Sequence, residues 1–447
     1  MSIPTPHGPV PSPRQLAWHR REMYGFVHLT VNTFTDREWG YGDEPESAFA
    51  PDQLDCTQWV AAAKAGGLKG LILTAKHHDG FCLWPTATTT HNITRSPFRD
   101  GKGDLVREFV DACRAGGIAC GLYCSPWDRN HPAYGTPAYV EVFHAQWREL
   151  LSNYGPLCEL WFDGANGGDG FYGGAREKRS IDHLTYYRLD DLWAMCRHLQ
   201  PEACMFSDAG PDLRWCGNEG GFTSSTCWSK VRPEGFAPGK VDSQQRLVEG
   251  DEDGSIWRPV EVDVSIRPGW FWHQHERARS SENLFRTWLA SVGRGAGLNL
   301  NLAPDKRGLI PESDVVELAR FRGLVEGFTA VDLVRGRATG EHAPLTDGDR
   351  DTFWAAPAAT ADLVIELGGA KEIAGLRLEE AIRFGQRVQA FAVDVRACGA
   401  WYEVARGTTI GAQRILQTGN MHGDAIRLRI LASQAPAVLA RLMVYAG

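Results

Sequence analysis

The chain has 447 residues, and its 47 Lys and Arg against 55 Asp and Glu give a net charge of −8. It therefore offers no basic surface for neutralising phosphates, and we expect no nucleic-acid partner. No apolar run reaches the roughly 18 residues that a membrane span needs, so we expect no membrane partner. The length suits one large domain and one smaller domain.

The N-terminus and the cysteines bear on the cellular compartment. The first thirteen residues contain five prolines and no apolar core of a secretory signal, which predicts an extended arm. The 11 cysteines are odd in number and lie mostly in apolar segments rather than at disulfide spacings. We expect a cytoplasmic protein, or a secreted or periplasmic one if a signal peptide has been removed.

From Tyr24 to about Leu324, short apolar runs alternate with amphipathic stretches, a pattern typical of βα units on a parallel sheet. The amphipathic stretch 104–115 places its apolar residues on one helical face, and Asp104 can cap its first turn. The expected strands are 24–31, 68–75, 118–124, 158–163, 203–207, 263–266 and 298–302, with an eighth near 223–228. We therefore predict an α/β fold with a (β/α)8-like catalytic barrel over residues 1–336.

The pattern changes after roughly Gly336, where short alternating strands follow one another without a helical period. The expected strands are 361–367, 373–379, 388–396, 401–405, 425–431 and 438–445. They predict a β-sandwich domain over residues 337–447. Its segment LTDGDRDTFW resembles the start of discoidin-like jelly-roll domains, for which sugar binding and packing against the barrel are both compatible roles.

Polar clusters follow several predicted barrel strands, at the end where barrel enzymes place catalysis. The first cluster comprises His28, Glu38 and Trp39, and the second comprises Lys76, His77, His78 and Asp79. A lone histidine such as His28 is also explained by a structural role. Adjacent histidines at a strand end alternate in direction, so at least one of His77 and His78 should face the pocket.

Two further clusters carry carboxylates. Asp163 ends a predicted strand, and the six glycines between positions 164 and 174 favour a mobile loop over a ligand. The segment FSDAGPDLRWCGNEGG brings together Asp208, Asp212, Arg214, Trp215 and Glu219. Helix capping by Asp163 and a solvated surface loop for the second segment are the structural alternatives.

Two carboxylates among His, Arg and Trp are what glycoside hydrolysis requires, one to attack or stabilise the sugar and one to protonate the leaving oxygen. The 16 tryptophans favour a carbohydrate, since indole faces stack on sugar rings. A metal-dependent hydrolase is an alternative, because His28, His77, His78 and Asp163 could form a zinc site. The chain has no His-Glu-x-x-His motif, which counts against that site, and no Gly-x-Ser-x-Gly elbow for a serine nucleophile. It also has no phosphate-loop motif, so we expect no nucleotide cofactor.

The chain resembles the α-L-fucosidases of glycoside hydrolase family 29 over residues 24–302, through the segments YGFVHLTVNTFTDREWG, LTAKHHDGFCLW, LYCSPWDRN, LWFDGANG and GPDLRWCGNE. The fourth and fifth segments further resemble the branch that cleaves α-1,3- and α-1,4-linked fucose from branched, Lewis-type oligosaccharides. The resemblance implies a fucosylated oligosaccharide substrate, a retaining mechanism through a covalent fucosyl-enzyme, and no metal. A non-catalytic fucose-binding lectin is the remaining alternative.

By this resemblance Asp163 is the nucleophile and Glu219 the general acid/base, with Glu261 competing for the second role because the acid/base loop varies in the family. The implied substrate-binding residues are His28, Glu38, Trp39, His77, His78, Tyr123, Trp161 and Arg214. Further residues expected at the pocket or its rim are Asp212, Asp263, Arg267, Trp270 and Trp272. Many family members read His-Trp-Gly where this chain has His-Leu-Thr at position 28, so that corner of the pocket is expected to differ.

The loop from Phe222 to Pro259, between Glu219 and the strand predicted at 263–266, has almost forty residues and is long for a plain connection. We expect this segment, with Asp212 and the aromatic residues 270–272, to form the site for the leaving group. A site that reads the galactose of a Lewis trisaccharide would make the enzyme selective for linkage.

Overall fold

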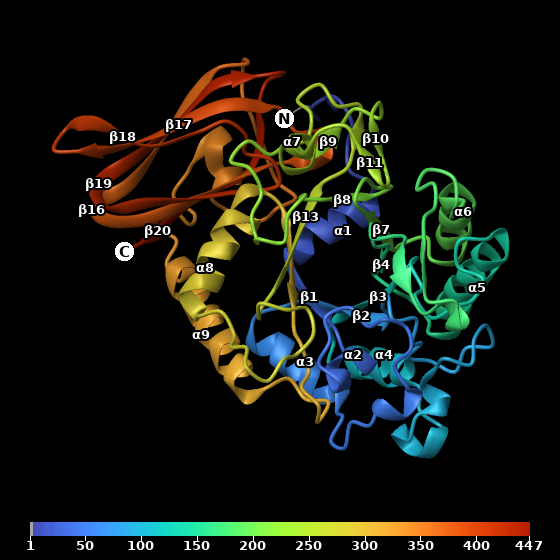
Figure 1. Cartoon of the computed structure of the whole chain (residues 1–447). Helices are drawn as coiled ribbons and strands as arrows, with labels where there is room; N and C mark the ends of the chain where they lie inside the picture. Colours follow the sequence, from blue (N-terminus) through green and yellow to red (C-terminus); the bar gives the residue numbers. More distant parts are fainter. Residues whose placement is uncertain (1–2) are drawn as a thin grey trace.

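Eight parallel strands close into a barrel in the computed structural model, which describes residues 3–447 (Figure 1). Their order around the barrel is β1-β14-β13-β8-β7-β4-β3-β2. The strands are β1 (Met23–Val27), β2 (Gly70–Lys76), β3 (Ala119–Cys124), β4 (Glu159–Trp161), β7 (Cys204–Ser207), β8 (Leu213–Trp215), β13 (Val260–Ser265) and β14 (Gly297–Asn301). The predicted barrel is confirmed.

The eighth strand lies in a different place from the one predicted. Residues 223–228 form no strand, and β8 instead follows β7 after only five residues, 208–212. Both strands nevertheless run parallel, with Phe206 paired to Leu213 and Ser207 to Arg214. A strand of three residues is too short to show an alternating pattern, which is why this segment reads as a charged loop.

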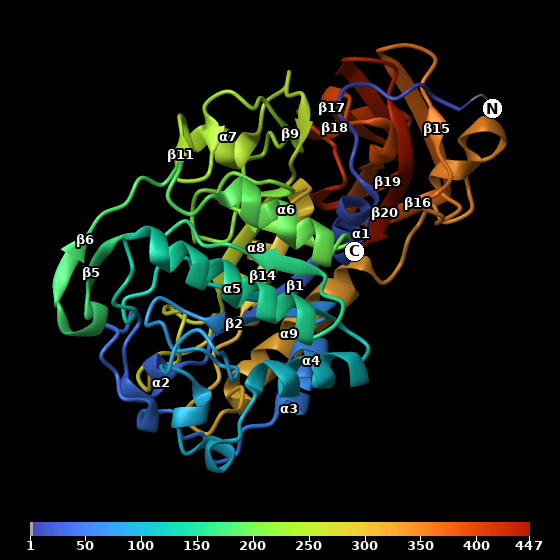
Figure 2. The ribbon, with the colours of Figure 1, turned by 90° about the vertical axis from the view of Figure 1, so that its right-hand side faces the viewer.

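The helices lie mainly outside the barrel, and Figure 2 shows α5 and α6 side by side on one flank. They are α1 (Pro13–Arg21), α2 (Val31–Thr35), α3 (Cys56–Ala65), α4 (Leu105–Ala115), α5 (Pro137–Asn153), α6 (Leu189–Leu199), α7 (Gln244–Glu249), α8 (Ser281–Ala290) and α9 (Glu312–Thr329). Helix α4 begins as predicted, because the Asp104 carboxylate accepts the Arg107 N–H at 2.9 Å. Within residues 3–447, no helix has the length and apolar composition of a membrane span.

Alternation along the strands decides which side chains enter the barrel. Tyr24, Phe26, Tyr123 and Trp161 pack in one cluster inside it. Because every second side chain of a strand faces the same way, the residues two positions further along reach the barrel mouth. This places Asp163 above Trp161 at the carboxyl end of β4.

Several short β-strands lie within the loops that follow the carboxyl ends of the barrel strands. They are β5 (Gly168–Gly170) and β6 (Glu177–Arg179) after β4, and β9 (Lys230–Val231), β10 (Phe236–Ala237), β11 (Lys240–Val241) and β12 (Ile256–Trp257) between β8 and β13. Strands β10 and β11 form an antiparallel hairpin. The long segment after Glu219 is therefore a folded insertion, which also contains α7.

The C-terminal domain is an antiparallel sheet in the order β15-β20-β16-β19-β17-β18. Its strands are β15 (Trp354–Ala355), β16 (Ala361–Glu380), β17 (Val388–Ala397), β18 (Ala400–Gly407), β19 (Arg414–Ser433) and β20 (Val438–Ala446). The two runs predicted at 361–367 and 373–379 form the single strand β16, which has register shifts between them. These shifts bend the sheet, so that Leu363 and Leu376, from the two halves of β16, share one core.

The two domains are joined by buried ion pairs and by the N-terminal arm. Glu22, just after α1, pairs with Arg377 at 2.7 Å and with Arg350 at 2.5 Å, both from the C-terminal domain. The arm runs along the same domain, where the His7 N–H donates to the Phe384 carbonyl at 3.0 Å (Figure 2). All 11 cysteines, which lie within the described residues, are free thiols.

Candidate active site

A cavity of about 290 Å³ opens at the carboxyl ends of the barrel strands. Ten of the fifteen residues expected at the site or its rim line it: His28, Trp39, His77, His78, Tyr123, Trp161, Asp163, Glu219, Asp263 and Trp270. The structure therefore gathers side chains from six separate strand ends and loops into one pocket. Glu38, Arg214 and Asp212 are not among its lining residues.

Asp163 lies just after the end of β4, and both of its carboxylate oxygens accept a hydrogen bond. Oδ2 accepts the Tyr123 hydroxyl at 2.8 Å, and Oδ1 accepts the Ala165 N–H at 2.6 Å. Burial raises the pKa of Asp163, while these two donors favour the ionised form and oppose that rise. The side chain is 21% exposed, so the carboxylate is fixed in direction and open to the cavity.

Glu219 lies beyond β8 on the exposed rim of the same cavity. Its Oε2 accepts the Trp270 indole N–H at 3.2 Å. Burial raises the pKa of Glu219 and the charge of Asp163 raises it further, although the Trp270 hydrogen bond acts in the opposite direction. The pKa is thus raised at both carboxyls, but Glu219 accepts one hydrogen bond where Asp163 accepts two, so its anion is the less stabilised and Glu219 is the better suited to donate a proton.

The hydrogen bonds around His28 determine which of its ring nitrogens carries the proton. Asn301 donates through Nδ2 to Ser265 Oγ at 2.9 Å and to the Trp270 carbonyl at 2.7 Å, so its Oδ1 is left as an acceptor. That oxygen lies 2.8 Å from His28 Nδ1, which must therefore be the protonated nitrogen. Burial lowers the pKa of His28 to about 3, so the ring is neutral and its Nε2 is a hydrogen-bond acceptor.

His78 is oriented in the same way by Ser125. The Ser125 hydroxyl donates to the Trp127 carbonyl at 2.7 Å and accepts from His78 Nδ1 at 2.7 Å. Burial, reinforced by nearby positive charge, lowers the pKa of His78 to about 3. Its Nε2 lies 3.8 Å from Asp163 Oδ2. His28 and His78 are therefore acceptors for hydroxyl groups, rather than the cationic donors that their residue type alone suggests.

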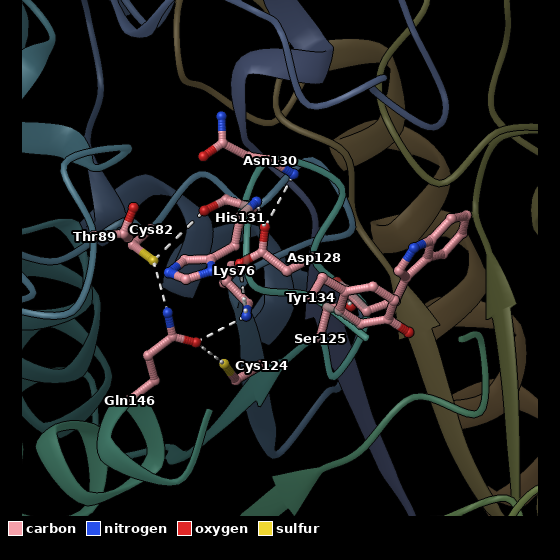
Figure 3. A network of polar contacts seen from close by, with 12 residues as sticks. Lys76, Cys82, Thr89, Cys124, Ser125, Asp128, Asn130, His131, Tyr134 and Gln146 are labelled. Atoms are coloured by element: carbon pink, nitrogen blue, oxygen red, sulfur yellow. Dashed lines mark hydrogen bonds and ion pairs between the residues drawn. The ribbon is translucent and has the colours of Figure 1, made fainter. Parts of the chain in front are cut away.

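A buried polar network supports the loop that carries Ser125 (Figure 3). The Lys76 ammonium donates to the Tyr139 hydroxyl at 2.9 Å and to Gln146 Oε1 at 2.8 Å, and it lies 3.5 Å from Asp128. Asp128 in turn accepts backbone N–H groups at positions 130 and 131. A fully buried cation with three polar partners fixes this loop, so Lys76 acts as a support beneath the site.

Aromatic rings form the floor of the cavity. Trp161 and Phe206 stack with ring centroids 4.2 Å apart, and Phe26 meets Trp161 edge to face at 4.9 Å. The sequence pattern did not single out Phe26 or Phe206, and it named Asp208 and Trp215 in a charged segment without assigning them to the pocket, although all four line the cavity. The signal that would have found two of them is alternation, because Phe26 precedes His28, and Phe206 precedes Asp208, by two residues.

Glu38 acts on the pocket through Trp270. Its carboxylate accepts the Trp270 backbone N–H and lies 2.9 Å from His273 Nε2. The other ring nitrogen of His273 lies 2.7 Å from Asp36, and the two carboxylates raise the pKa of His273 against the opposing effect of its burial. Glu38 therefore joins the loops after β1 and β13 and positions the indole that contacts Glu219.

The structure does not bring Arg214 and Asp212 to the pocket, which corrects both assignments. Arg214 alternates with Trp215 and points out of the barrel, where it donates to the carbonyls of Leu247 and Trp228 at 2.9 Å each. Asp212 precedes β8 and so lies at the opposite end of the strand, where it pairs with Arg14 at 3.2 Å and with Arg197. Both residues hold the fold around β8.

The remaining candidates are divided between the cavity and its surroundings. Glu261 is fully buried beneath the floor and accepts from Tyr24 at 2.7 Å and from Trp161 at 2.9 Å. Asp263 lines the cavity and accepts the Trp215 indole N–H at 2.7 Å. Arg267 pairs with Asp314 at 2.7 Å, and together with Trp272 it lines a separate hollow. Within residues 3–447, no group of three or more His, Cys, Asp or Glu side chains is arranged to hold a metal ion.

A parallel barrel with two carboxyls, neutral histidines and an aromatic floor at its mouth defines a carbohydrate-cleaving hydrolase. The α-L-fucosidase family model matches residues 7–322, and the F5/8 type C domain model matches residues 329–442. The chain belongs to the α-L-fucosidase family, glycoside hydrolase family 29, and its C-terminal domain is of the discoidin type. Its activity is accordingly that of an α-L-fucosidase acting on fucosylated glycans.

Relatives and solved structures agree with this assignment. The chain is 37% identical to alpha-L-fucosidase 1 of Arabidopsis thaliana, over 99% of this chain and 88% of the plant protein. A family 29 glycoside hydrolase from an unknown rumen bacterium superposes with a TM-score of 0.90 at 40% identity, covering 99% of this chain and 78% of that one. A family 29 fucosidase of Ruminococcus gnavus, solved in complex with fucose, superposes with a TM-score of 0.88 at 28% identity, covering 100% and 97% of the two chains.

Proposed function

We propose that the protein is a retaining exo-α-L-fucosidase in which Asp163 is the nucleophile and Glu219 the general acid/base. The observation that carries this proposal is the contrast between the two carboxyls of one cavity. Burial raises the pKa of both, but Asp163 accepts two hydrogen bonds that favour its charge, whereas Glu219 accepts one and has its pKa raised further by the charge of Asp163. Such a pair supplies one ionised and one protonated carboxyl at the same pH.

The reaction then proceeds in two displacements. An Asp163 oxygen attacks the anomeric carbon, the glycosidic bond breaks, and Glu219 gives its proton to the departing oxygen. A water molecule next gives a proton to Glu219 and attacks the same carbon, and the bond to Asp163 breaks. Two inversions at one carbon release L-fucose with the α configuration of the substrate.

The pocket walls suit a small deoxy sugar. The Nε2 atoms of His28 and His78 are acceptors for ring hydroxyls, since both Nδ1 atoms are protonated. The stacked rings of Trp161 and Phe206 offer an apolar surface for the face that bears the 6-methyl group. A sugar that kept a 6-hydroxyl would have to bury it against these rings without a partner.

We further propose selectivity for α-1,3- and α-1,4-linked fucose, supported by the insertion after Glu219. Its β10–β11 hairpin reaches the pocket wall, where the Gly239 N–H donates to Asp208 Oδ2 at 2.7 Å. Asp212 lies at the other end of the barrel, so the hairpin and Trp270 are the parts of the structure that support this selectivity. We expect kcat/KM for a Lewis trisaccharide to exceed that for 2′-fucosyllactose by about a hundredfold, or roughly 2.7 kcal/mol.

Proton NMR of the first product tests the mechanism. With an aryl α-L-fucoside, a retaining enzyme releases α-L-fucose before mutarotation, and β-L-fucose as first product would overturn the proposal. Absence of turnover would favour the lectin alternative. Loss of turnover in excess chelator, restored by added zinc, would favour the metal alternative. Equal rates on the two glycans would remove the linkage assignment alone.

A further inference from the structure

A second and larger hollow lies where the barrel meets the C-terminal domain. Its volume is about 680 Å³, and it shares no described residue with the cavity at the barrel mouth. One wall is formed by the C-terminal half of α8 and the turn Val292–Arg294, and the other by the end of β18 and the start of β19. Figure 1 shows α8 beside the strands of the C-terminal domain.

The charged side chains that line this hollow are all positive. Four arginines line it, Arg286, Arg294, Arg406 and Arg414, and no Asp or Glu does so among the described residues. Arg406 is paired with Glu403 at 2.8 Å. For the other three arginines, no carboxylate in residues 3–447 comes within the 4.0 Å of an ion pair. Glu282, one turn before the exposed Arg286 on α8, attracts Arg286 from beyond this distance, and the hollow itself is lined by no carboxylate.

Arg414 shows most clearly that this charge is buried. Arg414 is only 4% exposed. Nε donates to the Thr409 carbonyl at 2.9 Å, and Nη2 donates to the Ser225 carbonyl at 2.5 Å and to Thr409 Oγ1 at 2.9 Å, whereas Nη1 has no hydrogen-bond partner in the part of the chain described. Burial lowers the pKa of Arg414 to about 10, and the charge of Arg294 acts in the same direction. A buried guanidinium without a counter-charge is unfavourable.

Arg294 and Arg286 also keep unused donors. Arg294 donates through Nη1 to the Thr223 carbonyl, and Arg286 makes no side-chain hydrogen bond to any described residue. Guanidinium groups match the oxygens of sulfate and phosphate, to which they donate in pairs. The hollow is far larger than a bare oxyanion and falls within the range of roughly 300–1,000 Å³ typical of small-molecule sites.

We propose that this hollow binds a sulfate or phosphate group carried by a molecule of about sugar size, with Arg286, Arg294 and Arg414 as its donors. The anion supplies the missing counter-charge and fills the unused donors. Because the arginines belong to both domains, the bound molecule also braces the junction between barrel and sandwich. Binding to the folded state alone raises the stability of the whole chain by mass action.

Isothermal titration calorimetry of the full chain tests the proposal, with ionic strength held constant by sodium chloride. The probes are sodium sulfate, sodium phosphate, N-acetylglucosamine 6-sulfate and, as a neutral control, N-acetylglucosamine. We expect saturable binding of the charged probes at one site and no heat from the neutral sugar. Tighter binding of the sulfated sugar than of sulfate identifies an ester as the ligand, and equal binding identifies the free anion.

Charge-removing variants assign the binding to these arginines. Arg286→Gln and Arg294→Gln should each weaken binding by about tenfold or more, whereas Arg320→Gln, at an exposed arginine of α9, should bind as the wild type does. Unchanged turnover of an aryl fucoside by Arg286→Gln shows that the fold is intact. The proposal is overturned if no charged probe saturates below about 50 mM, or if Arg286→Gln and Arg294→Gln retain wild-type affinity.

Discussion

Replacing Glu219 and Glu261 by glutamine, one at a time, separates the two candidates for the acid/base role. Glu219 is exposed and accepts a single hydrogen bond, so Glu219→Gln should change the free energy of unfolding by no more than about 0.5 kcal/mol. Loss of a general acid should slow cleavage of a poor leaving group by about 10² to 10⁴, which corresponds to roughly 2.7–5.5 kcal/mol in activation free energy.

Glu261→Gln should have the opposite signature. Glu261 is fully buried and accepts from Tyr24, Trp161 and Asn299 at 2.7–2.9 Å, so the amide places a donor where the native carboxyl has only acceptors. A buried partner left unsatisfied costs about 1–3 kcal/mol. We expect a loss of about 2–4 kcal/mol in unfolding free energy, without any special dependence of the rate on the leaving group.

Two measurements distinguish the effects of these two variants on stability and on catalysis. Urea unfolding gives the stability change, and kcat/KM across a series of fucosides, from nitrophenyl to methyl, gives the dependence on the leaving group. If Glu261→Gln shows the steep dependence and Glu219→Gln does not, the reasoning from burial is refuted and the acid/base role moves to Glu261.

Three further outcomes follow from individual contacts. Trp270→Phe removes the hydrogen bond that lowers the pKa of Glu219, so that pKa should rise and the alkaline limb of the kcat/KM profile should move to higher pH; an unmoved limb would contradict the contact. Burial raises the pKa of Glu22, but its arginine partners, led by Arg377, more than offset this effect and hold the pKa below its ordinary value. The ionised Glu22 therefore stabilises the folded state above about pH 4.3, and this stabilisation is lost as pH falls. Glu22→Gln should cost about 3 kcal/mol near neutral pH and flatten the acid side of the stability profile, as urea unfolding at several pH values would show. Lys76→Met should destabilise the protein by about 3–5 kcal/mol, because it leaves a buried carboxylate without its cation; a thermal midpoint equal to that of the wild type would argue against the network.

Much of the fold is accessible from the sequence because most strands are long enough to show a period. The runs at positions 68–75 and 118–124 predict the ends of β2 and β3 to within two residues. Strand β8 is not predicted, since three residues are too few to show an alternating hydrophobic pattern. Strand β16 is predicted as two strands, since residues 368–372, Gly-Gly-Ala-Lys-Glu, look like a turn although the strand continues through them. Location in the cytoplasm stays a prediction.

The residue types of the candidate site can be predicted from the sequence, but the directions in which their side chains point cannot. A residue at a strand end faces the barrel mouth only if its phase in the strand is right, and the phase is known only once the strand is located. Arg214 is assigned to the pocket by the family resemblance and Asp212 by its charged segment. Because β8 is not located from the sequence, neither the outward phase of Arg214 nor the position of Asp212 before the strand can be recognised. The proton positions on His28 and His78 depend on Asn301 and Ser125, which no local pattern connects to them.

Azide rescue of Asp163→Gly tests the central claim most directly. Without its nucleophile, the variant should lose several orders of magnitude of aryl-fucoside turnover. Glycine also opens space beside the anomeric carbon, on the face from which the carboxylate would attack. Added azide should restore part of the activity and yield β-L-fucosyl azide, identified by NMR. A variant with near-normal turnover, or a rescued product of α configuration, would contradict the assignment of Asp163 as the nucleophile of a retaining fucosidase.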